Sequence, residues 1–168
     1  MSVADRVSTL GILGASAALV LGMPAIAAPA APPAPPAVVE LKAALIGANE
    51  IPGPGDLDGT GSAAVSIDLA AGKLCYTLMV ANVEGVTMAH IHKAPTGSMG
   101  NVVVPLSPPT SGSSQGCVQI RPELLAGILT TPSDYYVNVH SETNIAGAVR
   151  GQLGKGESAT PTAQNAKP

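Results

Sequence analysis

Apolar and polar residues alternate along several stretches of this chain. In the segment VVELKAAL, the apolar positions Val39, Leu41, Ala43 and Leu45 are separated by charged or small residues. The same period of two recurs in AAVSIDL, KLCYTLMV, CVQI and YYVNVH, and GAVRGQL is a further strand-like segment. A period of two is typical of β-strands with one buried face. Gly, Pro and Asn separate these segments, so the pattern predicts about seven or eight short strands.

Two segments depart from simple alternation. NVVVPL is apolar but contains Pro105, which favours an edge strand or a strand end. RPELLAGILTTP predicts a short helix, with Pro122 in its first turn, leucines and an isoleucine sharing one face, and Pro132 ending it. We therefore expect an all-β domain, a sandwich or barrel, with one short helix.

The N-terminal residues have the pattern of an export signal. Residues 7–22 carry no charge, and Ala25 and Ala27 form the small-x-small motif of a signal-peptidase site. We expect residues 1–27 to be removed and the protein to be exported to the periplasm or the extracellular medium. The alternative is a retained membrane anchor, but Pro24 and the many small residues make a poor span. After cleavage we expect no stable membrane anchor.

Composition divides the remainder into three parts. Residues 28–37 contain only Ala and Pro and predict a semi-rigid linker. Residues 38–153 form the predicted domain. Residues 154–168 are small, polar and unpatterned, which predicts a disordered tail.

Composition also limits the partners. The chain has no Phe or Trp, only three Tyr, and a net charge of −3. Nucleic acid binding relies on cationic and aromatic surfaces, so we expect no nucleic acid partner. A metal ion and a protein are the partners that the composition leaves as candidates.

The two cysteines, Cys75 and Cys117, both lie at positions that alternate with the predicted buried residues of their strands. An exported chain with an even number of cysteines is typically disulfide-bonded. We expect a Cys75–Cys117 disulfide, with free thiols or thiolate metal ligands as the alternatives.

The three histidines predict a metal site. His90 and His92 are separated by one residue in AHIHKA, so they share one face of a strand, together with Met88. His140 ends YYVNVH on the face opposite its apolar residues. If the two strands are neighbours, the three imidazoles converge on the outer face of the sheet, and imidazole is a common ligand of Zn, Cu, Fe and Ni. The alternative is that they are ordinary surface histidines.

Met88 also has a possible role in this site. Met79, Met88 and Met99 lie near the H-x-H motif, and soft thioethers select Cu(I). We therefore expect copper, with Met88 as a possible further ligand. The alternative role for these methionines is to fill gaps in packing.

The segments GANEIP, AHIH, YYVNVH and GAVRGQL, in this order, resemble the CHRD domain family over about residues 45–153. That family is similar to the β-barrel of Cu/Zn superoxide dismutases, which implies an immunoglobulin-like Greek-key β-sandwich. In this comparison His90, His92 and His140 correspond to copper ligands. Arg150 corresponds to an arginine that attracts the anionic substrate, but the strand pattern leaves its direction open.

The differences from the dismutases bear on function. No histidine lies between His92 and His140, so the bridging ligand and the zinc site are missing, and the long electrostatic loop is absent. A non-catalytic copper-binding module using these histidines is the first hypothesis. A structural or protein-interaction domain without metal, and a degenerate dismutase-like enzyme, are the alternatives, since fold alone does not decide function.

Overall fold

The computed structural model describes residues 38–156. The predicted signal peptide, the linker and residues 157–168 of the predicted tail lie outside the described residues. The elements follow one another along the chain as β1 (Val38–Ile46), the 3-10 turn η1 (Gly47–Asn49), β2 (Thr60–Asp68), β3 (Lys73–Ala81), β4 (Val86–Lys93), β5 (Asn101–Leu106), β6 (Ser113–Gln119), α1 (Pro122–Thr130), η2 (Pro132–Asp134), β7 (Tyr135–Ser141), β8 (Val149–Gln152) and β9 (Gly154–Lys155).

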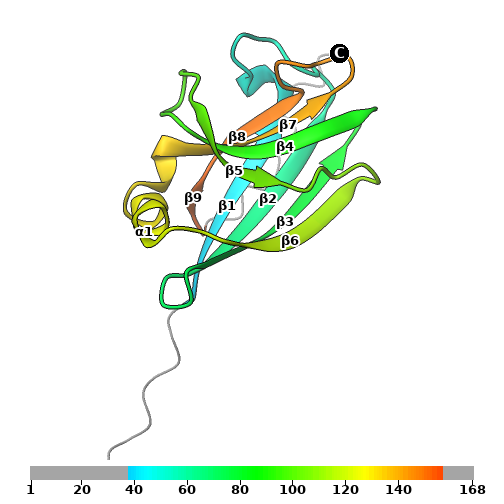
Figure 1. Ribbon diagram of the computed structural model, residues 1–168. Coiled ribbons are helices and arrows are strands. Elements are labelled where there is room, and N and C mark those ends of the chain that lie inside the picture. The colour runs from blue at the N-terminus through cyan, green and yellow to red at the C-terminus, as the bar shows by residue number, and fades with distance from the viewer. Residues whose placement is uncertain (1–37, 157–168) are drawn as a thin grey trace, which may run out of the picture. The chain divides into compact units, whose positions relative to one another are not determined.

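The strands form one antiparallel sheet that curls into a nearly closed barrel (Figure 1). Their order is β5-β4-β7-β8-β1-β2-β3-β6, with β9 added beside β1. The predicted all-β fold with one short helix is therefore confirmed. The strand that contains Pro105 lies at one edge of this sheet, where the missing N–H of proline is tolerated.

The barrel interior is filled by the residues that the alternating pattern marked as apolar. Leu41 and Leu45 of β1 have no exposed surface, and neither do Ile91 of β4 and Val137 of β7. The helix α1 lies at one end of the barrel, and its Leu125 joins the same core cluster. Burial of these side chains gives the sheet a fixed register, because a slip by one residue would turn every one of them outward.

The predicted disulfide is present. Cys75 of β3 lies directly opposite Cys117 of β6, and their sulfur atoms are bonded. The bond joins the edge strand β6 to its neighbour, on the face that points away from the core.

One predicted boundary was wrong by two residues. Gly154 and Lys155, which we assigned to the start of the disordered tail, form β9 and pair with Lys42 and Leu41 of β1. Their backbone hydrogen bonds to β1 extend the ordered domain past residue 153.

In the described part of the chain, no helix is long and apolar enough to cross a membrane.

Candidate metal centre

The pairing of β4 with β7 brings the three histidines together. The two strands run antiparallel side by side (Figure 1). In their register His90 lies opposite Asn138, His92 opposite Tyr136 and Met88 opposite His140. Ala89 and Ile91 point into the core, so the histidines point outward, as the alternation predicted. One nitrogen from each imidazole lies within 4.8 Å of a nitrogen of the other two. The two strands are therefore neighbours, and the three imidazoles converge as expected for that case.

The outer face is more covered than the strand pattern suggested. Every residue of β7 is buried, including those that alternate with the core positions, and His140 is only 8% exposed. His90 and His92 are half-buried. The segments 94–100 and 142–148, which connect strands, supply backbone partners to the histidines. The histidines thus lie in a partly enclosed site on the barrel surface.

Two of the three imidazoles are held by backbone carbonyl groups. Nδ1 of His92 lies 2.9 Å from the carbonyl oxygen of Gly100, and Nδ1 of His140 lies 3.0 Å from that of Ile145. A carbonyl oxygen only accepts, so each Nδ1 carries the proton and donates it. In the neutral rings, each Nε2 atom then carries the lone pair and is the position that can bind a metal ion.

The imidazole of His90 lies directly against that of His140. Nδ1 of His90 lies 3.3 Å from Nε2 of His140. Two nitrogens that bind one ion at about 2.0 Å are separated by roughly 3.4 Å, so this pair already has the spacing of two ligands. Nε2 of His92 is buried and has no hydrogen-bond partner among the described residues. A buried nitrogen without a partner is costly unless a ligand satisfies it, so this donor set fits a metal ion.

The surroundings of the site favour neutral imidazoles. Burial lowers the pKa of His90, and the neighbouring His140 and His92 lower it further. Burial also lowers the pKa of His92, against the opposing effect of the Gly100 carbonyl. A metal ion competes with protons for these nitrogens, so rings that are neutral near pH 7 are ready to bind one.

A buried carboxyl group is hydrogen-bonded to Asn138 of β7. Glu50, just after η1, is 5% exposed, and its Oε1 accepts a hydrogen bond of 2.6 Å from Nδ2 of Asn138. Burial raises the pKa of Glu50 to about 7, although the positive charge of Arg150 and the hydrogen bonds to Ile51 and Asn138 lower it. The strand pattern placed Asn138 on the same face as His140, but nothing in the sequence pointed to Glu50 as its partner.

Arg150 has a different role from the one that the dismutase comparison suggested. Its side chain is 2% exposed, and its guanidinium lies over the ring of Tyr136 and donates to the carbonyl oxygen of Ser98. These contacts hold it inside the structure, whereas an arginine that attracts anions must face solvent. Tyr136 in turn stacks on His92, and sequence reasoning did not identify Tyr136 as part of the site.

Met88 lies beside the site but is not enclosed by it. Its side chain is 46% exposed and its strand neighbour on β7 is His140. Its role as a ligand stays a prediction.

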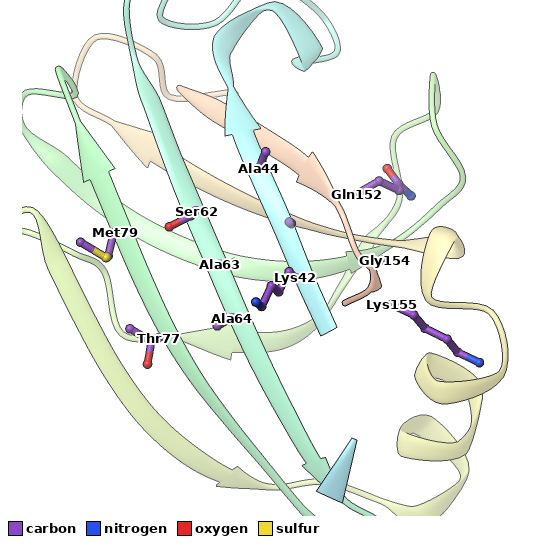
Figure 2. Close-up of a pocket in the computed structure, with 11 residues that line it drawn as sticks. Lys42, Ala44, Ser62, Ala63, Ala64, Thr77, Met79, Gln152, Gly154 and Lys155 are labelled. Atoms are coloured by element: carbon purple, nitrogen blue, oxygen red, sulfur yellow. The ribbon is translucent and has the colours of Figure 1, made fainter. Parts of the chain in front are cut away.

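A second hollow lies on a different part of the barrel (Figure 2). Figure 2 shows mostly short side chains on β1, β2 and β3, with Gln152 and Lys155 to one side. Its lining contains no imidazole, thiolate or carboxylate; the residues are Lys42, Ala43, Ala44, Ser62, Ala63, Ala64, Thr77, Met79, Gln152, Gly154 and Lys155. Its chemistry therefore does not suggest a metal site, in contrast to the histidine cluster.

The comparison with family models identifies the domain. The model of the CHRD domain matches residues 41–153. The chain belongs to the CHRD domain family. The match runs from β1 through β8 and includes all three histidines of the site. No curated protein and no solved structure gives a significant match to this CHRD domain chain.

Proposed function

We propose that this CHRD domain is a non-catalytic copper-binding module of the periplasm or the extracellular medium, which carries or buffers a single copper ion. The observation that supports the proposal most directly is the convergence of His90, His92 and His140 within 4.8 Å. Two rings are anchored through Nδ1, and the buried Nε2 of His92 has no other partner. Such anchoring orients a ligand before the metal arrives.

Copper is favoured over other metals for two reasons. Among divalent first-row ions, copper binds most tightly to a given set of nitrogen ligands. The thioether of Met88, next to His140 across the strands, would add a soft ligand that suits the reduced ion. The Cys75–Cys117 disulfide is consistent with an oxidising compartment, which supports export.

Calorimetric titration with copper tests the proposal. The wild-type protein is expected to bind one ion, and His90→Ala, His92→Ala and His140→Ala should each weaken binding to a similar extent, because each removes one of three ligands. Met79→Leu is a matched control for Met88→Leu, since both side chains are about half exposed and Met79 lies on β3, in the hollow described above. Loss of affinity in Met88→Leu alone supports a thioether ligand. Absence of saturable binding in the wild type contradicts the proposal.

A structural domain without metal is the second candidate. The hydrogen bond between His90 and His140, together with the two carbonyl anchors, forms a network that holds β4, β7 and two connecting segments without any ion. In that case His140→Ala should lower the unfolding midpoint of the metal-free protein by several degrees, and copper should not raise the midpoint of the wild type. A copper-dependent rise in the midpoint favours the binding module, because a ligand that binds only the folded state stabilises it.

A further inference from the structure

The His92 ring is supported by a stack of two side chains. The ring of Tyr136 is nearly parallel to it, with an angle of 6° between the planes and 4.7 Å between the centroids. The guanidinium carbon of Arg150 lies 3.4 Å from the centroid of the Tyr136 ring. Since β7 lies between β4 and β8 in the sheet, His92 and Arg150 approach Tyr136 from opposite neighbouring strands. Tyr136 and Arg150 are both almost fully buried, so the stack has little freedom to move.

The same two residues hold the segment that anchors His92. Arg150 Nη2 donates a hydrogen bond of 2.7 Å to the carbonyl oxygen of Ser98. The hydroxyl of Tyr136 accepts a hydrogen bond of 3.3 Å from the N–H of Gly100. The carbonyl of that same Gly100 accepts the proton of His92 Nδ1. Arg150 and Tyr136 therefore act on His92 both through its ring face and through the carbonyl that sets its tautomer.

We propose that Arg150, acting through Tyr136 and the segment 94–100, is a positioning residue that orients Nε2 of His92 for metal binding. This inference rests on the proposed function. A guanidinium is planar and stacks on an aromatic ring while its N–H groups donate, and the ammonium of lysine does not combine these two contacts. Without the guanidinium, Ser98 loses its donor and the Gly100 carbonyl is held less firmly. His92 is then free to rotate or to place its proton on Nε2, which removes the lone pair from the site.

Three substitutions distinguish a positioning role of Arg150 and Tyr136 from a merely structural one. Arg150→Lys keeps the positive charge and removes the planar stack, and Tyr136→Leu removes the ring between Arg150 and His92. Both should weaken copper binding by about 10- to 100-fold, the usual effect of removing a group that orients a ligand. Tyr136→Phe keeps the ring and loses only the hydroxyl that holds Gly100, so it should recover most of the affinity lost in Tyr136→Leu. Arg121→Lys, at the exposed start of α1, is the matched control and should leave affinity unchanged.

The test combines cupric ion titration of the full chain at pH 7.5 with nitrogen-15 NMR of the imidazoles in the metal-free protein. The expected result is weaker binding in Arg150→Lys and Tyr136→Leu, together with loss of the single Nδ1–H tautomer of His92. A folded Arg150→Lys protein that keeps both the wild-type affinity and this tautomer overturns the inference while leaving the proposed function intact. A wild type without saturable binding overturns the proposed function and the inference with it. Should Arg150→Lys not fold, the comparison of Tyr136→Leu with Tyr136→Phe decides by the same two readouts.

Discussion

Replacing Glu50 with Gln should change how the stability of the domain depends on pH. The carboxyl group is almost fully buried, and the only side chain that donates a hydrogen bond to it in the described structure is that of Asn138. Burial raises its pKa from 4.5 to about 7, although the charge of Arg150 and the hydrogen bonds act in the opposite direction. Gln has the same shape as the protonated acid and does not titrate, so the variant imitates the neutral form at every pH.

The expected magnitude follows from the two pKa values. A difference between 4.5 in the unfolded chain and about 7 in the folded chain corresponds to about 3 kcal/mol. Because the folded pKa is raised, the folded chain holds this proton more tightly. Its stabilising contribution is therefore complete below about pH 4.5 and is lost as the pH rises through about 7.

The assay is urea unfolding of both proteins at a series of pH values from about 4.5 to 8.5. The lowered pKa values of His90 and His92 change stability in the opposite direction over part of this range, since they favour the folded state as pH rises toward the usual His value. They are common to both proteins and cancel in the difference. The free energy of unfolding of Glu50→Gln, minus that of the wild type, should increase by about 3 kcal/mol between the lowest and highest pH.

A charge-removal control completes this experiment. Glu84→Gln removes an exposed carboxyl group and measures the effect of changing net charge alone. The account of the buried carboxyl group would be refuted by either of two results. The free energy of unfolding of Glu50→Gln, minus that of the wild type, could be constant with pH, or it could decrease as the pH rises.

Four further predictions concern the disulfide, the site and the N-terminus. Reduction of Cys75–Cys117 should lower the free energy of unfolding by up to about 4 kcal/mol, as measured by urea unfolding with and without reductant, because the bond no longer restricts the unfolded chain. Gly100→Ala should weaken copper binding in calorimetry, because an added Cβ would lie 1.9 Å from a backbone oxygen and displace the carbonyl that holds His92. Copper affinity measured across pH should be nearly constant above about pH 6.5 and should fall only at lower pH, since the pKa of His92 is lowered. Intact mass of the exported protein should give an N-terminus at Ala28, and a full-length chain in the membrane fraction would support the anchor instead.

The strand pattern predicted the parts of the site that depend on the strands alone. Alternation in AHIH and YYVNVH placed the three histidines opposite the core, and the observed pairing of β4 with β7 brings them together. These predictions held because side-chain direction in a strand follows directly from position.

The surroundings of the site could not be predicted in this way. Glu50 and Asn138 are separated by 88 positions, and Arg150 reaches Ser98 across 52 positions. Such contacts depend on the paths of the segments between strands, which period-two alternation does not describe. The position of Tyr136 on the same face as His140 was visible in the sequence, but its stacking on His92 depends on strand register. The alternating pattern also did not predict the burial of His140, because segments outside the strands produce that burial.

X-ray absorption spectroscopy of the copper-loaded protein tests the central claim most directly, since it identifies the atoms bound to the metal. The account predicts three imidazole nitrogens at about 2.0 Å from one copper ion, and loss of one of them in His140→Ala. A spectrum with one imidazole or none, unchanged in His140→Ala, would contradict the claim that His90, His92 and His140 form a copper site.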